Sequence, residues 1–168
     1  ALHCQKSTAR EIHEADADYV LALKGNQGTA HGEVRAFLDD AILRAAPHLV
    51  KMETLEKSHG RIEIRRYWQS GEIGWFADRA EWEALRSVGV VEAVREVAGS
   101  APSTERRYYL SSLRPDIERF ARAVRGHWSV ENQLHWSLDV SFEEDRRRAR
   151  TRHAASNLAS LRRISLNL

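Results

Sequence analysis

The chain has 168 residues, of which 42% are hydrophobic and 30% are charged, and its formal net charge is +2. This composition is typical of a folded globular protein and excludes an intrinsically disordered chain. The longest apolar run, 19–23, is too short to span a bilayer and no secretory signal pattern is present, so we expect no membrane association. The single cysteine, Cys4, excludes an intramolecular disulfide and suits a reducing cytoplasm.

The first part of the chain alternates helical and strand patterns. Ser7 or Thr8 can cap a helix that runs to about Ala15. The apolar run DYVLALK at 18–24 follows and predicts a buried strand. Thr29 can cap a further helix that ends before Pro47. A helix–strand–helix order around a buried strand favours an α/β architecture.

The middle of the chain is rich in strand patterns. Alternating residues on both sides of the turn SHG predict a hairpin from Val50 to Trp68. A short helix is expected over about 80–87. The stretches VVEAVREVAG and TERRYYLSSL then predict two more strands joined by the turn GSAPS. Residues 50–113 are therefore expected to form a β-rich module between helical segments.

Helical patterns return near the C-terminus. Asp116 can cap a helix that continues through Gly126, and a last helix is expected over 153–168. If the first of these helices is continuous, an apolar stripe forms along it from Phe120, Ala123, Val130, Leu134 and Leu138.

Arginines are concentrated in three short stretches. One lies at 61–66, one at 106–107 and the densest at 146–152. Guanidinium groups bind phosphate in a bidentate manner, so this clustering suits a nucleic-acid ligand. Runs of charge usually form a solvated surface, and this alternative stays open.

The stretch RGHWSVENQLHWSLDVSFEED at 125–145 carries the most unusual chemistry. His127, Glu131 and His135 follow one another at i, i+4 spacing, on a helix face that borders the apolar stripe. A carboxylate at the rim of a core can bind Mg²⁺ or Mn²⁺, or can pair with an arginine. A zinc site from all three residues is disfavoured, because they would spread over about 12 Å along one helix. The histidines more readily pack or hydrogen-bond to substrate.

Several sequence blocks together resemble one known family. They are ALHCQK, YVLALKGNQG, SHGRIEIRRYW, RYYLSSL, FARAVRGHW, HWSVENQLHWSLDVSFEEDRRRAR and NLASLRRISLNL. In this order they resemble the C-terminal part of ISAs-type insertion-sequence transposases, also called H-repeat-associated proteins. The resemblance covers nearly the whole chain.

The resemblance implies a DDE transposase with an RNase H-like catalytic core, in which two aspartates and one glutamate bind two Mg²⁺ or Mn²⁺ ions. Glu131 matches the glutamate. The resemblance places the second aspartate immediately before Ala1 and the first farther upstream, so this chain alone is expected to be inactive. The implied partner is DNA, both the transposon ends and the target. The resemblance also implies a homo-oligomer that binds this DNA, in the cytoplasm at the nucleoid.

The resemblance also divides the chain into three parts. Residues 1–49 would be the second part of the RNase H-like core, 50–113 a β-rich insertion, and 114–168 the core helices that carry Glu131. Hairpin-forming relatives place a tyrosine, an arginine and a lysine around this glutamate. Val124, His127 and Leu138 stand at those positions here, so the resemblance does not extend to a hairpin mechanism that uses those groups.

Contacts to DNA are expected at three places. Lys24 and Asn26 leave the predicted buried strand at the edge where sites in open sheets form. Arg125, His127 and His135 lie near Glu131 in the sequence. The expected contacts to the DNA backbone are Arg146, Arg147, Arg148, Arg150 and Arg152.

Three functions are consistent with these features. The first is the C-terminal part of a transposase that cuts and joins DNA by metal-dependent phosphodiester transfer. The second is a non-catalytic DNA-binding or oligomerisation module derived from a transposase. The third is a zinc hydrolase, which would retain metal through purification.

Overall fold

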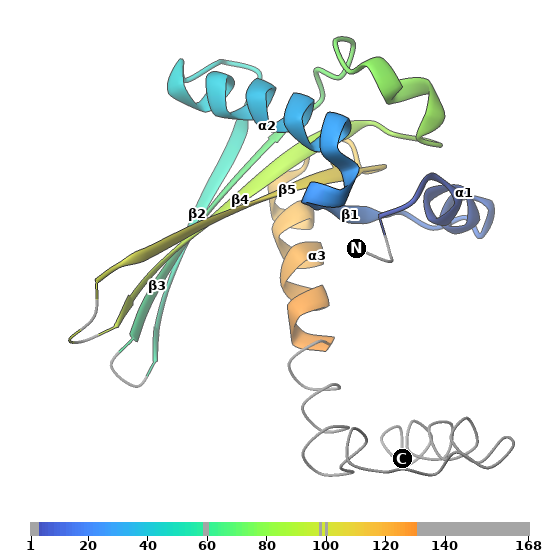
Figure 1. The fold of residues 1–168 in the computed structure, drawn as a ribbon. Helices are drawn as coiled ribbons and strands as arrows, with labels where there is room; N and C mark the ends of the chain where they lie inside the picture. The colour runs from blue at the N-terminus through green and yellow to red at the C-terminus, as the bar shows by residue number, and fades with distance from the viewer. Residues whose placement is uncertain (1–3, 59–60, 98, 100, 131–168) are drawn as a thin grey trace, which may run out of the picture. The chain divides into compact units, whose positions relative to one another are not determined.

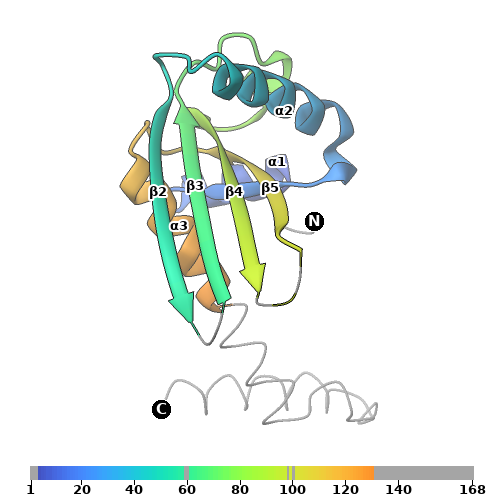
Figure 2. The same cartoon turned by 90° about the vertical axis from the view of Figure 1, so that its left-hand side faces the viewer.

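The structure is a computed structural model that describes residues 4–58, 61–97, 99 and 101–130. The chain divides into two compact units, 1–123 and 124–168. The first unit contains an antiparallel sheet with the strand order β1-β5-β4-β3-β2 (Figures 1 and 2). The strands are β1 Val20–Leu23, β2 Val50–Ser58, β3 Arg61–Ser70, β4 Ser87–Val97 and β5 Ser103–Ser111. The helices are α1 Lys6–Glu14, α2 Gly28–Leu43 and α3 Ile117–Val130, with short 3₁₀ helices η1 Gly25–Gln27 and η2 Ala77–Glu81.

The predicted mixture of helices and strands is confirmed, and it is organised around one sheet. β1 comes from the segment 1–49, yet it pairs antiparallel with β5 from the segment 50–113, with Leu21 opposite Leu110. The two segments therefore share a sheet. Their assignment to an RNase H-like core and to an insertion remains a prediction.

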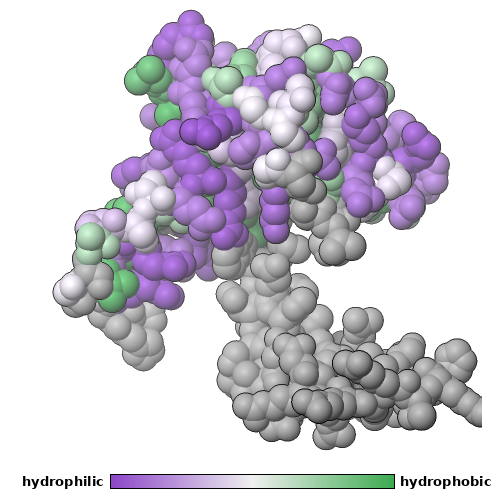
Figure 3. Space-filling view, in the orientation of Figure 1, coloured by the Kyte–Doolittle hydropathy of each residue, from purple (hydrophilic) through white to green (hydrophobic). Residues whose placement is uncertain are grey.

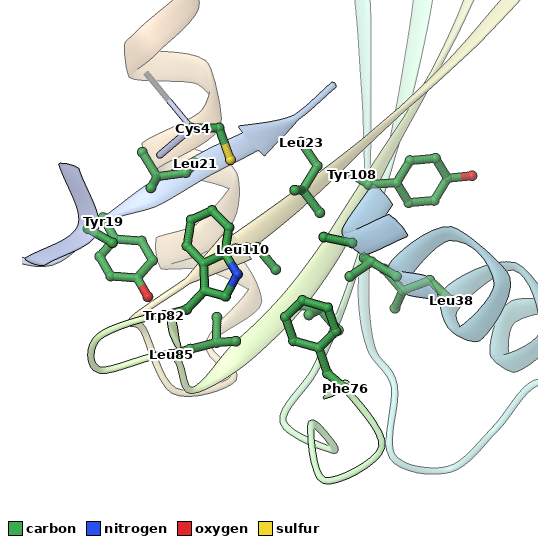
Figure 4. Close-up of a cluster of buried hydrophobic side chains, with 14 of the residues drawn as sticks. Cys4, Tyr19, Leu21, Leu23, Leu38, Phe76, Trp82, Leu85, Tyr108 and Leu110 are labelled. Carbon is green, nitrogen blue, oxygen red and sulfur yellow. The ribbon is translucent and has the colours of Figure 1, made fainter. Parts of the chain in front are cut away.

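One face of the sheet forms the main core with α2. Leu21 and Leu23 of β1 lie beside Leu110 and Tyr108 of β5, and Leu38 of α2 packs against this layer (Figure 4). Phe76, Trp82 and Leu85 from the connection between β3 and β4 complete the same cluster. The buried residues of α2, which are Ala30, Val34, Leu38 and Ala41, form one apolar side of the helix.

The opposite face of the sheet is covered at the start of α3. Phe120 is fully buried and lies directly on Gly89 of β4. Its ring also meets the ring of Tyr109 edge to face, with the centroids 5.6 Å apart. A Cβ atom at position 89 would lie only 2.6 Å from Phe120 Cζ, so this close approach requires glycine.

Several local predictions were wrong. α1 begins at Lys6 and α2 at Gly28, so Ser7, Thr8 and Thr29 lie inside the helices and are not their caps. The helix expected over 80–87 is a 3₁₀ helix at Ala77–Glu81, after which the chain turns into β4 at Ser87. Ala84 has a φ of 55°, which a right-handed helix does not allow. β1 is buried on one face only, because Val20 and Ala22 are half-exposed while Leu21 and Leu23 are buried.

No helix among the described residues is both long enough and apolar enough to cross a bilayer.

Gly89→Ala is expected to lower the free energy of unfolding by about 1–3 kcal/mol, because the added methyl group overpacks the contact with Phe120. Urea denaturation of the chain measures this loss. Gly74→Ala is the matched control, since no atom lies within 4 Å of a Cβ at that position. Equal stabilities of the two variants would contradict the close packing of Phe120 on β4.

Candidate functional site

The helix that leads toward Glu131 begins at a well-defined cap. Asp116 Oδ1 accepts a hydrogen bond from the backbone N–H of Arg119 at 3.0 Å, and the Asp116 carbonyl accepts one from Phe120 N–H at 2.9 Å. This is the arrangement of an N-cap aspartate, and it confirms the cap predicted from sequence. α3 then continues through Gly126 to Val130, the residue before Glu131 in the chain.

Buried polar side chains of the sheet hold the segment in front of α3. Gln69 of β3 donates from Nε2 to Ser87 Oγ at 2.8 Å and accepts from the backbone N–H of Asp116 at its Oε1, at 3.0 Å. Ser87 Oγ in turn donates to the carbonyl of Leu113 at 2.7 Å. Gln69 and Ser87 are fully buried, so water does not compete for these bonds.

A second set of contacts comes from the beginning of β1. Ser112 Oγ accepts from Tyr19 N–H at 2.9 Å and donates to Asp18 at 2.8 Å. Ser111 Oγ donates to the Tyr19 carbonyl at 3.0 Å. Arg119 of α3 also reaches Asp18, at 2.8 Å.

These contacts act together on one short segment. We call Gln69, Ser87, Ser111, Ser112 and Asp116 the α3 anchor. They bind the chain at 111–116 from β1 on one side and from β3 and β4 on the other. Because a buried polar group without a partner costs about 1–3 kcal/mol, other placements of this segment are disfavoured. The start of α3 is therefore fixed to the sheet.

Most of the expected catalytic and DNA-binding residues lie outside the described part of the chain. These residues are Glu131, His135, Arg146, Arg147, Arg148, Arg150 and Arg152. Arg125 is an exposed residue of α3, and His127 belongs to the same helix.

Lys24 and Asn26 lie where β1 ends. Lys24 is exposed and precedes η1, and Asn26 is part of η1. The argument from the edge of a parallel sheet does not apply to them, because β1 pairs antiparallel with β5. Their contact with DNA remains a prediction without that support.

Several arginines of the sheet contact carboxylates. Four residues stand opposite one another across β2, β3, β4 and β5, in the order Glu53, Arg66, Glu92 and Arg106. Arg66 contacts Glu53 at 2.7 Å and Glu92 at 3.0 Å, and Arg106 contacts Glu92 at 2.7 Å. Arg106 also reaches Asp39 of α2 at 2.9 Å. We call these five residues the charge ladder.

The electrostatics of the ladder favour ionised carboxylates. Burial alone would raise the pKa of Glu92, but its hydrogen bonds to Arg106 and Arg66 outweigh burial and lower the pKa below its usual value. Tyr108 donates to Asp39 at 2.8 Å, and burial together with this bond raises the pKa of Tyr108 to about 12. Arg106 and Tyr108 thus link Asp39 of α2 to β5 of the sheet.

On the other face of the sheet, arginines contact glutamates of the same strand or diagonally across strands. Arg65 contacts Glu63 at 2.7 Å and Glu56 at 3.0 Å, and Arg107 contacts Glu105 at 2.8 Å. In two of the three arginine stretches, Arg65, Arg66, Arg106 and Arg107 thus contact carboxylates of the sheet. Phosphate binding by these stretches remains a prediction. The sequence analysis did not anticipate the glutamates that lie beside these arginines in the sheet.

The described residues contain no group of three histidine, cysteine or acidic side chains that could hold a metal ion. The nearest acidic residue to β1, Asp18, is engaged by Ser112 and Arg119.

Comparison with known proteins gives one family. The family model described as "Transposase DDE domain" matches residues 1–168. The chain is 38% identical to the candidate transposase YncI of Escherichia coli O157:H7 and 36% identical to the H repeat-associated candidate transposase YhhI of Escherichia coli K12. Each alignment covers 100% of this chain, but only 44% and 45% of the two relatives, respectively.

A third relative covers less of the chain. A protein encoded in the dhlA 3′ region of Xanthobacter autotrophicus is 44% identical over 69% of this chain and 38% of its own length. The chain thus spans less than half the length of the relatives it matches. No solved structure matches it.

Gln69→Leu is expected to lower the free energy of unfolding by about 2–3 kcal/mol, because it removes two buried hydrogen bonds and leaves the Asp116 N–H without an acceptor. Chemical denaturation provides the measurement. Gln5→Leu serves as control, because Gln5 is exposed and makes no side-chain cap bond, and it should change stability by less than about 0.5 kcal/mol. A Gln69 variant as stable as this control would show that the α3 anchor contributes nothing.

Proposed function

Since this chain belongs to the transposase DDE domain family, we propose that it is the part of a DDE transposase that supplies the catalytic glutamate, Glu131. The family match over the whole chain is the observation that carries this proposal. The fold supports it, because α3 is held at its start by buried hydrogen bonds and extends to the residue before Glu131. Catalytic groups gain precision when they follow a rigid element.

The proposed reaction is phosphodiester transfer on DNA. Two divalent metal ions bound by three carboxylates activate water or a DNA 3′-OH and stabilise the leaving oxygen. In this chain Glu131 is the ligand assigned by resemblance, and two aspartates would come from outside it. The residues described here would serve to position the helix before Glu131.

The sheet itself supports an assignment of DNA contacts to the C-terminal arginines. Arg65, Arg66, Arg106 and Arg107 already pair with glutamates, so their charge is largely neutralised within the fold. The stretch 146–152 has five arginines in seven positions, preceded by the acidic residues of EED. We assign phosphate contact to this stretch, and to Arg125, His127 and His135 near Glu131.

Glu131→Gln is expected to abolish DNA cleavage in a polypeptide that carries this chain behind an upstream segment with both aspartates. The amide loses the charge that a metal ligand needs, while its shape is nearly unchanged. Plasmid nicking with Mg²⁺ or Mn²⁺ measures the loss. Glu118→Gln, a change at an exposed glutamate of α3, is the control and should leave cleavage intact.

The 168-residue chain alone should not nick plasmid DNA under the same conditions. Robust cleavage by the purified chain would overturn the proposal that two ligands come from outside it. Undiminished cleavage by the longer Glu131→Gln protein would instead favour a role without catalysis for this residue.

Replacing the five arginines of 146–152 with glutamine should weaken binding to all DNA sequences. Each lost phosphate contact reduces the slope of log affinity against log salt by about 0.9. Fluorescence anisotropy over a salt series measures both effects. Replacing Arg10, Lys51 and Arg79, which lie on α1, β2 and η2, is the control for general loss of positive charge. Affinity and slope that match wild type in the 146–152 variant would reject this assignment.

A further inference from the structure

The outer edge of β2 is available for pairing. β2 is the last strand of the sheet, and within the described part of the chain only β3 pairs with it (Figure 2). It is nine residues long, from Val50 to Ser58. An edge of this length presents a row of backbone N–H and C=O groups to any strand that can align with it.

An apolar row ends at this edge. Leu55, Ile64 and Val94 stand opposite one another on β2, β3 and β4. Leu55 is the outermost of them and is 55% exposed. In the space-filling view, hydrophobic surface appears toward the far end of the sheet, at the lower left (Figure 3). On each of these strands, the residue of the apolar row is two positions from the residue of the charge ladder, so both rows lie on the same face of the sheet.

We propose that β2 pairs antiparallel with β2 of a second copy of this chain, with Leu55 opposite Leu55 of that copy. This inference concerns the edge of the sheet and does not rest on the transposase assignment. In a two-fold arrangement centred on Leu55, Glu53 stands opposite Lys57 of the second copy, and Lys57 stands opposite its Glu53. Both positions point to the same side of the sheet, because they are separated by an even number of residues.

The register continues both rows of side chains across the junction. The apolar rows of the two copies join end to end through the two Leu55 residues. The charge ladder gains a cation at its end, so that the signs alternate through Arg66, Glu53 and Lys57 of the second copy. Among the described residues no carboxylate forms an ion pair with Lys57, so this ammonium group is free to act as the partner.

The polar residues of the opposite face also match in this register. Thr54 stands opposite Glu56 of the second copy. Thr54 Oγ1 is buried and has no hydrogen-bond partner within the described residues. Met52 stands opposite Ser58 on the same face, so no like charges oppose each other there.

Other two-fold registers of β2 are less favourable. Centring on Thr54 sets Lys51 opposite Lys57, and centring on Glu53 or Glu56 sets two carboxylates against each other. Directly opposed like charges destabilise a strand pair. Centring on Met52 matches Glu53 with Lys51 but pairs only residues 50–54, whereas centring on Leu55 pairs residues 52–58.

Disulfide trapping in the 168-residue chain tests the proposal. Cys4 is buried and burial raises its pKa to about 11, so the native thiol does not interfere. Directly opposed residues in an antiparallel pair have Cβ atoms about 4.5–5.5 Å apart, close enough for a disulfide after small adjustment. Leu55→Cys should therefore form a covalent dimer under mild oxidation, seen on a non-reducing gel and by mass spectrometry.

Leu43→Cys is the matched control for random collisions. Leu43 is 85% exposed, more than Leu55, and is the last residue of α2, outside the proposed strand pairing. Leu55→Cys should cross-link at least tenfold faster than Leu43→Cys. A Leu55 variant that stays monomeric, or that cross-links no faster than the control, overturns the proposal.

A mixture of two variants tests the register. Glu53→Cys and Lys57→Cys should form a mixed dimer, while each alone should not, because identical positions lie roughly 14 Å apart along the paired strands. Preferential cross-linking of Glu53→Cys with Lys51→Cys would overturn the register centred on Leu55.

The charge pairs give an independent readout without new thiols. Lys57→Glu should raise the dissociation constant of the dimer roughly tenfold in sedimentation equilibrium, because it opposes glutamates at two symmetric positions. Adding Glu53→Lys should restore most of the affinity. An unchanged constant for Lys57→Glu contradicts the proposed pairing.

Discussion

The placement of α3 depends on a small group of buried hydrogen bonds, centred on the Gln69 side chain. This buried amide donates a hydrogen bond to Ser87 Oγ and accepts one from the backbone N–H of Asp116. That N–H belongs to the cap residue of α3. A side chain of a central strand thereby determines where a helix begins. The same hydrogen bonds help to place Phe120, in the first turn of α3, against Gly89.

The charge ladder provides ion-pair partners for charged residues that are partly or fully buried on the sheet. Glu92 is buried, and two arginines compensate the cost of burying its carboxylate. Through Asp39 the ladder also reaches α2, so sheet and helix are joined by ion pairs as well as by the apolar core. One consequence concerns function. Arginines that neutralise glutamates contribute less to the attraction of DNA, which supports the proposal that the basic stretch 146–152 contacts the phosphates.

Local signals in the sequence predicted much of the secondary structure but not its assembly. Asp116 could be identified as a cap, and the hairpin of β2 and β3 could be identified from alternation, because both depend on neighbours in the chain. The bond from Asp116 to Gln69 joins residues 47 positions apart, and no local pattern indicates it. The pairing of β1 with β5 was missed for the same reason. The prediction of a helix near residues 80–87 was wrong. Trp82 and Leu85 are buried in the core, but they lie in an irregular segment after the 3₁₀ helix.

The candidate site also combines a residue that the sequence identifies with contacts that only the structure shows. The resemblance singled out Glu131 from a chemically unusual stretch, and the structure shows how the helix before it is attached to the sheet. Hydrogen exchange of the wild-type chain tests this attachment most directly. Backbone amides of 120–123 in α3 should exchange as slowly as those of Tyr67 and Val90 in the sheet, because both open only when the whole unit unfolds. Amides of α3 that exchange orders of magnitude faster, while the sheet stays protected, would contradict the account.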